Sequence, residues 1–402
     1  METINARILN RRVHGRSAFL DVLSNGQNMQ MYINTDVENF TTIIELPIGS
    51  FIRSVGSFFI TRTGHNTFRI ESAEVLFIPN RILPVVQDDG ENRFNETTNI
   101  EDIRRRRYLQ TILNADERQV FITRSRIINI IRNFFIQRNY LEVETPILQP
   151  IYGGAEANPF VTSFESLDTN FFLRIAPELY LRRMIIGGYD RVFEIGRNFR
   201  NEGLSNRHNP EFTFIEVYTA FENYLFSMDM VTDLFTNLFN EFGEVEYNGN
   251  IINFSNIERR RYIDLVEEVC EVDASTLTDD EIVNLFENNV ERSLINPTIV
   301  YDYPSSISPL SQVRSDNPLI AERFEIYVGG MEIGNAYSEL NDVNRHIQNI
   351  GTEDADFIEA LEYGMPPTTG IGLGIDRLVM ILTNRVIRDV IFFPAMRQQN
   401  NN

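Results

Sequence analysis

The chain has 402 residues, of which 43% are hydrophobic, and a formal net charge of −21 at pH 7. Its length allows two or three domains, and its charge argues against a protein that coats nucleic acid nonspecifically, because that requires a broad positive potential. No apolar run is long enough to span a membrane and the amino terminus lacks the apolar core of a signal peptide, so we expect a cytoplasmic protein.

Lysine and tryptophan are absent, and all 36 basic residues are arginine. Two origins of this composition stay open: removal of lysine by engineering, which we favour, or a natural chain made under an unusual coding or supply constraint. Either way, mechanisms that need a lysine nucleophile or a P-loop lysine are excluded, whereas arginine can still bind phosphates. The single cysteine, Cys270, excludes an internal disulfide framework, and four scattered histidines argue against a structural zinc site.

Residues 4–80 have the composition of a small β-domain. Turn sequences separate five segments rich in β-branched and aromatic residues: Asn5–Leu9, Ala18–Leu23, Met29–Ile33, Phe51–Ile60 and Thr67–Phe77. Five short strands in so few residues predict a five-stranded barrel over residues 1–86, and the oligonucleotide-binding (OB) fold is one such barrel.

The next segments predict a linker and a second domain. The polar run DDGENRFNETT at 88–98 is typical of a linker, which we extend over 87–119. From Val120 apolar residues recur at helical intervals, and this helix would open a domain over 120–402. Two prolines make residues 141–150 extended. The remaining strands are grouped as hairpins without a βαβ rhythm, so we predict an α+β fold with an antiparallel sheet.

The segment 197–216, RNFRNEGLSNRHNPEFTFIE, concentrates groups that suit a bound nucleotide. Its functional side chains are those of Arg200, Glu202, Arg207, His208, Phe212 and Glu216. The guanidiniums and the imidazole can neutralise phosphates, and the phenyl ring can stack on a base. The carboxylates could meet a cation or an amine. The alternative is a surface hairpin laced with ion pairs, which is the usual form of a charged run.

Two later segments add candidate groups. In RFEIYVGGMEIGNAYSELND, Glu325 and Glu332 flank a glycine turn, so adjacent strands could bring them together around Mg²⁺; the alternative is a solvated acidic pair. In GIGLGIDR, at 370–377, alternating glycines permit close approach of a ligand or a neighbouring element. Arg377 opens a hydrophobic helix, where an unpaired arginine would be costly.

Together these segments resemble the class II lysyl-tRNA synthetases, in the subgroup that also holds the aspartyl and asparaginyl enzymes. LEVETP resembles motif 1, FRNEG…RHNPEFT motif 2 and GIGLGIDRLVM motif 3, and the likeness runs from about Asn5 to Arg397. The phrases RIAPELYLRR, EIGNAYSELND, ALEYGMPPT and RDVIFFPAMR match as well. The lysyl branch is preferred because Asp376, not glutamate, precedes Arg377, and because motif 2 reads FRNEG rather than FRAE.

The resemblance implies an ATP- and Mg²⁺-dependent ligase that forms lysyl-adenylate and charges lysine tRNA. Its ATP site would consist of Arg200 for the α-phosphate, Glu202 for the adenine amino group, Phe212 and Arg377 for the adenine faces, Arg207 and His208 for the outer phosphates, and Glu325 and Glu332 for Mg²⁺. Its lysine pocket would consist of Gly154 and Glu178 for the α-amino group, Asn335 for the carboxylate, Tyr337 for the aliphatic chain, and Glu216, Tyr218 and Glu339 for the ammonium group. Arg200 and Arg377 would be the catalytic residues, because this chemistry depends on positioning and electrostatics rather than on a lysine nucleophile.

The resemblance also implies partners other than the small substrates. In the barrel, Phe19, Gln30 and Glu74 fall where the family reads the central anticodon base by stacking and edge hydrogen bonds. The alternative for Phe19 is a place in the barrel core. A homodimer through the motif 1 helix and strand is expected.

The chain departs from the family pattern in several places. We expect the amino-terminal helical extension to be missing. Residues 261–297 and the segment after Asn341 are shorter than usual, and Asn158 replaces a common basic residue. These departures and the charge of −21 put tRNA affinity in question more than adenylation.

Two other functions stay open. One is a paralogue that passes lysine to a protein or small molecule, and the other is a regulatory or binding module with an inactive site. The barrel argues against the first, and the complete set of ATP-site residues argues against the second.

Overall fold

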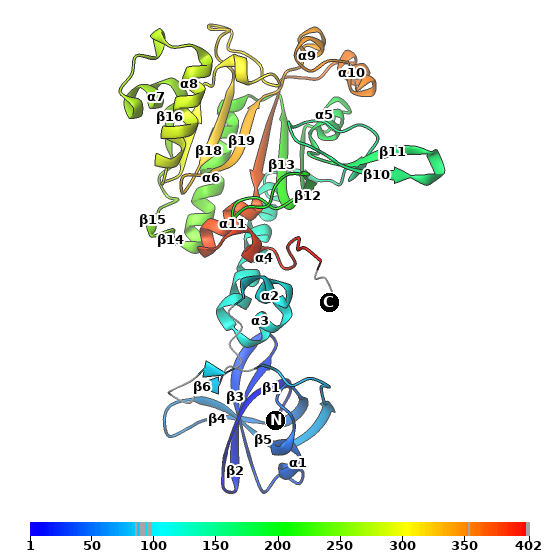
Figure 1. Ribbon diagram of the computed structural model, residues 1–402, viewed down its shortest axis with the longest axis vertical. Helices are drawn as coiled ribbons and strands as arrows, with labels where there is room; N and C mark the ends of the chain where they lie inside the picture. Colours follow the sequence, from blue (N-terminus) through cyan, green and yellow to red (C-terminus); the bar gives the residue numbers. More distant parts are fainter. Residues whose placement is uncertain (85–86, 89–92, 95–98, 353, 399–402) are drawn as a thin grey trace. The chain divides into compact units, whose positions relative to one another are not determined.

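The computed structural model describes residues 1–84, 87–88, 93–94, 99–352 and 354–398. It divides into two units, Met1–Ile122 and Thr123–Asn402 (Figure 1). Part of the predicted linker at 87–119, namely 89–92 and 95–98, lies outside the described residues. Among the described residues, no helix is both long enough and apolar enough to cross a membrane.

The first unit contains a closed five-stranded barrel, as predicted. Its strands follow the order β1-β2-β3-β5-β4 and comprise β1 (Glu2–His14), β2 (Ser17–Ser24), β3 (Gln27–Asn34), β4 (Phe51–Ile60) and β5 (Asn66–Phe77). Helix α1 (Phe40–Glu45) joins β3 to β4. The barrel closes where β1 pairs antiparallel with β4 and β3 pairs parallel with β5.

Strand β1 is much longer than the predicted Asn5–Leu9. Its first half pairs with β4 and its second half with β2, and the register shifts between Ile8 and Asn10. The polar second half was missed because its pairing is set by the partner strand rather than by hydrophobic alternation. In β2 the alternation is clear, since Ala18, Leu20 and Val22 are fully buried in the barrel core.

After the barrel come the short strands β6 (Gln87–Asp88) and β7 (Arg93–Phe94) and the helices α2 (Ile100–Arg105), α3 (Arg107–Leu113) and α4 (Ala115–Ile136). Helix α4 begins before the predicted Val120. Asn114 precedes it, and its side-chain Oδ1 accepts a hydrogen bond from the backbone N–H of Asp116 at 2.9 Å. A side-chain cap and acidic residues in the first turn both stabilise a helix start.

The second unit is built on an eight-stranded sheet. Its order is β16-β17-β18-β19-β20-β13-β12-β8, and all neighbours are antiparallel except the edge pairs β16–β17 and β12–β8. The strands are β8 (Leu141–Glu142), β12 (Arg191–Phe199), β13 (Glu211–Ala220), β16 (Glu258–Arg261), β17 (Thr298–Tyr301), β18 (Arg323–Tyr327), β19 (Glu332–Ser338) and β20 (Thr368–Gly374). The α+β prediction with an antiparallel sheet is therefore confirmed.

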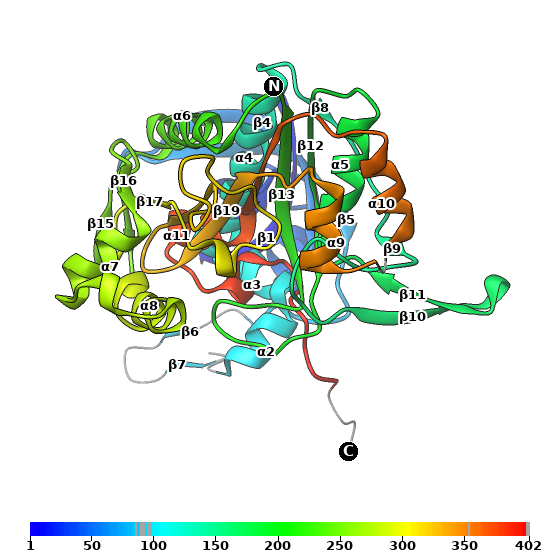
Figure 2. The same cartoon turned by 90° about the horizontal axis from the view of Figure 1, so that it is seen from above.

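Smaller elements border this sheet. A three-stranded sheet contains β9 (Leu148–Gln149), β10 (Phe160–Phe164) and β11 (Thr169–Leu173), and β14 (Val245–Tyr247) pairs with β15 (Asn250–Ile252). The helices are α5 (Glu178–Ile186), α6 (Tyr224–Phe242), α7 (Tyr262–Cys270), α8 (Asp279–Leu285), α9 (Val343–Ile350), α10 (Ala355–Glu362), α11 (Ile375–Thr383) and α12 (Ile387–Val390). Helix α6 packs on β18, β19 and β20, whereas α5 contacts β12 and β13 and carries α10 on its outer side (Figure 2).

The alternation of side chains along β13 decides where a ligand can bind. Ile215 and Val217 are buried among core residues. The residues between and beside them, Phe214, Glu216 and Tyr218, face the opposite way and line a cavity. The functional groups of the second unit therefore gather on the face of the sheet that α6 does not cover.

Candidate active site

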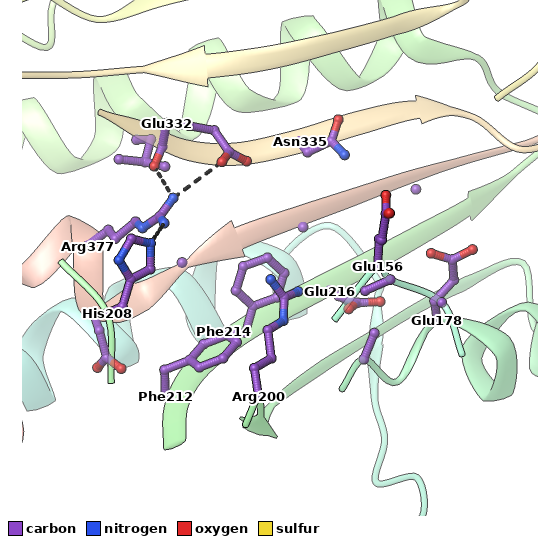
Figure 3. A pocket seen from close by; sticks show the side chains of 18 of the residues that line it. Glu156, Glu178, Arg200, His208, Phe212, Phe214, Glu216, Glu332, Asn335 and Arg377 are labelled. Carbon is purple, nitrogen blue, oxygen red and sulfur yellow. Dashed lines mark hydrogen bonds and ion pairs between the residues drawn. The ribbon is translucent and has the colours of Figure 1, made fainter. Parts of the chain in front are cut away.

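A cavity of about 370 Å³ lies on this face, over β13, β19 and β20. The following predicted site residues line it: Gly154, Glu178, Arg200, Glu202, Arg207, His208, Phe212, Glu216, Tyr218, Glu332, Asn335, Tyr337 and Arg377 (Figure 3). The predicted residues Glu325 and Glu339 lie outside this lining. Segments that are far apart in the sequence thus contribute to one cavity.

One end of the cavity carries the arginines and the aromatic rings. The Arg200 guanidinium lies 5.3 Å from the centre of the Phe212 ring. Arg377 donates from Nη1 to the backbone carbonyl of Glu332 at 2.5 Å, and its Nη2 lies 3.4 Å from Nε2 of His208. Desolvation lowers the pKa of Arg200, and desolvation together with the neighbouring Arg377 lowers the pKa of His208. These directions are those expected of positive groups gathered in a partly buried site.

A buried ion pair fixes the helix that presents Arg377. Arg124 of α4 pairs with Asp376 in the first turn of α11 and donates from Nη2 to Thr213 Oγ1 at 2.8 Å. The other carboxylate oxygen of Asp376 accepts the backbone N–H of Thr213 at 2.8 Å. Helix α11 is therefore tied to β13 at the point where Arg377 enters the cavity, and the arginine is partnered as expected for the start of an apolar helix.

The other end of the cavity is acidic. Glu178 accepts hydrogen bonds from Arg182 Nη1 at 3.0 Å and from the Tyr337 hydroxyl at 2.9 Å. The Tyr218 hydroxyl donates to Glu216 Oε2 at 3.1 Å.

Glu339 lies just beneath this end. Its Oε2 is 3.3 Å from Arg182 Nη1, yet neither side-chain oxygen accepts a hydrogen bond from another described residue. A Cβ on Gly370 would lie 2.2 Å from Glu339 Oε1, so only a glycine there leaves this carboxylate next to the cavity.

Burial and mutual repulsion disfavour the ionised forms of the carboxyl groups at this end. Burial, with the nearby Glu178 adding to it, raises the pKa of Glu216 to about 8. Burial also raises the pKa of Glu178 and, more strongly, that of Glu339, although Arg182 opposes both shifts. Arg182 pairs with Glu178 and Glu339, and Glu216 adds a third carboxyl group close to them, so a cationic ligand group would restore the charge balance.

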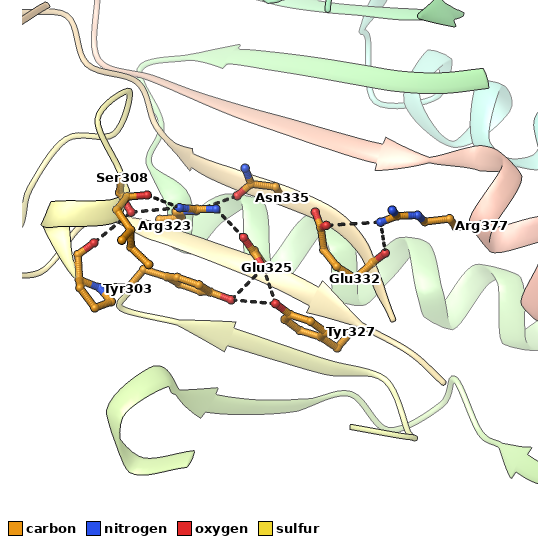
Figure 4. Close-up of polar contacts among 10 residues, drawn as sticks. Tyr303, Ser308, Arg323, Glu325, Tyr327, Glu332, Asn335 and Arg377 are labelled. Atoms are coloured by element: carbon orange, nitrogen blue, oxygen red, sulfur yellow. Dashed lines mark hydrogen bonds and ion pairs between the residues drawn. The ribbon is translucent and has the colours of Figure 1, made fainter. Parts of the chain in front are cut away.

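The two carboxylates predicted to hold Mg²⁺ lie on the neighbouring strands β18 and β19 (Figure 4). Glu325 Oε2 accepts from the hydroxyls of Tyr303 at 3.1 Å and Tyr327 at 2.5 Å, and its Oε1 pairs with Arg323. Desolvation and the neighbouring Glu325 raise the pKa of Glu332. Two oxygen donors that repel each other suit a hard cation. Among the described residues, no group of three or more His, Cys, Asp or Glu side chains gathers as a metal site.

The predicted anticodon residues lie on the barrel of the first unit. Phe19 lies between the buried Ala18 and Leu20 and stands outside the core cluster, with its ring 5.2 Å from that of Tyr32. Gln30 accepts a hydrogen bond from Thr67 at 3.0 Å, and the exposed Glu74 pairs with Arg53 at 2.5 Å. Phe19 therefore does not occupy the core position that was its alternative.

Several lining residues were not predicted. Glu156, Phe214 and Arg323 line the cavity, and Arg182 lies directly behind it. Alternation along the strands could have identified Phe214 and Arg323, because each lies two residues from a predicted site residue. The i,i+4 spacing could have identified Glu178 as a partner of Arg182, but nothing in the sequence marks its second partner, Glu339, which is distant in the chain.

The chain is similar to known proteins over almost its whole length. A family model described as class II tRNA synthetases (D, K and N) matches residues 99–397. A lysine–tRNA ligase of Campylobacter jejuni is 41% identical over 445 residues, which cover 98% of this chain and 87% of the relative. The lysine–tRNA ligases of Dichelobacter nodosus (40% over 441 residues, 98% and 87%) and Wigglesworthia glossinidia brevipalpis (40% over 446 residues, 99% and 88%) are similar. These alignments are longer than the 402-residue chain, so the relatives contain internal residues that it lacks.

Proposed function

The chain belongs to the class II tRNA synthetases of the D, K and N group, and we propose that it is a lysine–tRNA ligase that activates L-lysine with ATP and transfers it to the 3′ end of lysine tRNA. The relatives of about 40% identity that carry the name lysine–tRNA ligase support this assignment. So does the cavity, which is basic and aromatic at one end and acidic at the other.

The acidic end is the single observation that carries the choice of lysine. Glu178 and Glu339 both pair with Arg182, Glu216 lies close enough to both carboxyl groups to repel them, and the pKa of Glu216 is raised to about 8. A substrate with an ammonium group at its far end and an α-amino group nearby would neutralise them. An aspartate or asparagine side chain would bring no positive charge to this end, and aspartate would add repulsion.

We assign the remaining groups of the cavity as the resemblance implies. Arg200 contacts the α-phosphate and the attacking carboxylate, while Glu202, Phe212 and Arg377 hold the adenine and Arg207 and His208 hold the outer phosphates. Asn335 meets the lysine carboxylate, and Tyr337 and Gly154 border the chain and the α-amino group. Glu325 and Glu332 suit Mg²⁺ by their donor atoms, and the bound ion would neutralise charge on the phosphates.

The reaction proceeds by displacement and needs no covalent enzyme intermediate. A carboxylate oxygen of lysine attacks the α-phosphorus in line, and the bond to the β-phosphate breaks to release pyrophosphate. Arg200 stabilises the charge that grows on the α-phosphate. The terminal ribose hydroxyl of the tRNA then attacks the activated carbonyl, and AMP leaves.

The other assignments concern partners and location. We assign residues 1–86 to anticodon binding through Phe19, Gln30 and Glu74, 87–119 to a linker and 120–402 to catalysis, in the cytoplasm. A homodimer would use the motif 1 helix and strand, and the apolar side chains Leu141, Ile147, Leu148 and Tyr152, in LEVETP and just after it, are between 44% and 53% exposed. Sedimentation velocity tests the homodimer, since a monomer at micromolar concentration would exclude it.

We attribute the absence of lysine to engineering; a near-identical parent with scattered Lys→Arg differences would support that origin.

Lysine-dependent ATP–pyrophosphate exchange tests the activity. Exchange with lysine, and not with aspartate or asparagine, is expected. Absence of exchange would leave only the inactive binding module. Exchange without charging of lysine tRNA would instead identify the paralogue that passes lysine to another acceptor.

A further inference from the structure

Arg323 lines the cavity, and the function proposed above gives no role to its hydrogen bonds. It lies on β18, opposite Tyr337 of β19, and its side chain is 17% exposed. Its ring partner is Tyr303, whose centre lies 4.8 Å from the guanidinium carbon. The side chain is therefore held on one flank before any ligand arrives.

The Arg323 guanidinium makes hydrogen bonds to three different parts of the protein (Figure 4). Nη1 donates to the backbone carbonyl of Ile307 at 2.8 Å and to Ser308 Oγ at 3.2 Å, which anchors it to the loop before β18. Nη2 pairs with Glu325, one of the two carboxylates assigned to Mg²⁺. Nε donates to Asn335 Oδ1 at 3.1 Å. Most of its N–H groups are thus committed to the protein rather than free for a substrate.

The bond to Asn335 fixes which end of that amide faces the cavity. An arginine can only donate hydrogen bonds, so the Asn335 atom against Nε must be the oxygen and not the nitrogen. No described residue accepts a hydrogen bond from Asn335 Nδ2, and Asn335 lines the cavity. The amide is consequently oriented with its two N–H donors available to an acceptor in the cavity.

We propose that Arg323 is a positioning residue. Its hydrogen bond to Asn335 Oδ1 holds the amide with its N–H groups toward the substrate carboxylate, and the same guanidinium also pairs with the Mg²⁺ carboxylate Glu325. This inference rests on the proposed function. It predicts that Arg323 serves recognition of the carboxylate, through Asn335, and not recognition of the ammonium group. Without this hydrogen bond, the amide can turn its oxygen toward the carboxylate, which would repel it.

The test compares L-lysine with 1,5-diaminopentane, which is lysine without its carboxylate. Binding of each is measured by calorimetry without ATP or Mg²⁺, so that the link to Glu325 does not enter. Arg323→Gln should weaken lysine binding by about 10- to 100-fold, the factor expected for a hydrogen bond to a charged group. Binding of the diamine should change by less than about threefold, because it lacks the group that Asn335 contacts. A similar loss for both ligands would make Arg323 merely structural and overturn the proposal.

A double-mutant cycle separates action through Asn335 from direct contact. Asn335→Ala should reproduce the selective loss, and the Arg323→Gln/Asn335→Ala variant should bind lysine no more weakly than the worse single variant. Losses that multiply would mean that Arg323 meets the substrate by itself, which contradicts the proposal. The matched control is Arg314→Gln, since Arg314 pairs with Asp302 and Asp316 outside the cavity and should leave the selectivity unchanged.

A second variant keeps the test decisive if Arg323→Gln does not fold. Asn335→Asp retains an oxygen for Arg323 but replaces the donor by a negative oxygen, so it should discriminate against lysine and retain the diamine. Unchanged lysine binding by Asn335→Asp would overturn the proposal. If the unmodified protein binds no lysine at all, the proposed function fails instead, and this outcome is distinct from every result above.

Discussion

At the scale of single residues, arginines take the place that lysine has in other phosphate enzymes. Arg200 and Arg377 enter the cavity from the end of β12 and from α11. Arg377 is held by hydrogen bonds to Glu332, and the Arg200 guanidinium lies 5.3 Å from the centre of the Phe212 ring. A guanidinium stays charged even when desolvated, because its pKa starts above 12. Loss of lysine from the chain therefore removes nothing that this site needs.

Replacing Arg377 tests the basic end. Arg377→Ala should lower the rate of lysine-dependent pyrophosphate exchange by about 100-fold or more, as removal of one preorganised donor does in other enzymes. Stopped exchange assays at saturating lysine provide the measurement. Arg126→Ala, which removes an arginine whose side chain is 60% exposed, is the control. Retained activity in Arg377→Ala would refute the motif 3 assignment.

The titration of Glu216 gives a second prediction. Because the pKa of Glu216 is about 8 in the free protein, this carboxyl is largely protonated at pH 7. The ammonium group of lysine favours its ionised form, so binding at pH 7 should release a proton and affinity should rise between about pH 6 and pH 8. Calorimetry in buffers of different ionisation enthalpy measures the proton count. Glu216→Gln should abolish the release; an unaltered proton count in that variant would assign the titration elsewhere.

The raised pKa of Glu216 also makes the free energy of unfolding depend on pH. The folded pKa lies above the unfolded value of 4.5, so between these two values the folded state binds more protons. The free energy of unfolding should therefore fall as the pH rises from about 4.5 to 8, with no further contribution from Glu216 above 8. Urea titrations across this range, with and without saturating lysine, measure the slope. Lysine should flatten it, and a slope that Glu216→Gln leaves intact would contradict this origin.

Residue roles were the part of the site that the sequence could predict least on physical grounds. Motif 2 contains Arg200, Arg207, His208 and Phe212 in one short segment, so the basic and aromatic character of this end could be inferred from residue chemistry. The acidic end could not, because its three glutamates come from distant segments and only the resemblance joined them. Arg182 and Arg323 were missed for the same reason: their partners are set by the fold.

At the scale of elements, β13 and β20 act together. Glu216 lies opposite Gly372 and Tyr218 opposite Gly370. A glycine beside each large side chain gives the aromatic and acidic groups of β13 their space. A Cβ at Gly372 would meet the Phe214 ring at 2.6 Å. The alternating glycines thus serve a neighbouring element, one of the two uses that their spacing predicts.

Gly370→Ala tests this arrangement. The added Cβ would lie 2.2 Å from Glu339 Oε1 and 2.7 Å from the Tyr218 ring, so we expect weaker lysine binding and a loss of about 1–3 kcal/mol in stability from overpacking. Gly374→Ala on the same strand is the matched control, because its Cβ would meet only ordinary contacts at 3.5 Å. Thermal unfolding and lysine affinity are measured for both. Equal behaviour of the two variants would show that space beside Gly370 is not limiting.

Elements with clear periodicity were predictable and elements set by partners were not. The five barrel strands, the extended segment after α4 and the strand nature of the Glu325 and Glu332 segments followed from composition and alternation. The second half of β1 and the first turn of α4 did not, because strand pairing and a capping asparagine decide them. The antiparallel order of the large sheet was inferred only as a class, since long-range pairing leaves no local signal.

At the scale of the whole molecule, the absence of lysine removes a chemical liability of the proposed reaction. Lysyl-adenylate is an activated mixed anhydride, and amines attack such carbonyls. The 402-residue sequence contains no lysine, so no side chain in it carries a primary amine. An enzyme that releases its intermediate in the absence of tRNA would therefore have almost nothing of its own to acylate.

Intact-mass measurement checks this property. After incubation with ATP, lysine and Mg²⁺ but no tRNA, the side chains of this sequence should carry no lysyl adducts that resist hydroxylamine. Variants with one exposed lysine, Arg16→Lys or Arg126→Lys, should gain an additional adduct. Adducts on internal residues of the lysine-free chain, in positions that resist hydroxylamine, would disprove the expectation.

The absence of tryptophan gives two hydrogen bonds of the acidic end an optical consequence. Tyrosine emission is then not masked by indole, and a phenol that donates to a carboxylate emits weakly. Tyr218 and Tyr337 donate to Glu216 and Glu178, whose ionisation and hydrogen bonds a lysine ammonium and α-amino group would change. Substrate binding would thus change the tyrosine fluorescence of the protein, so binding could be followed without an added dye.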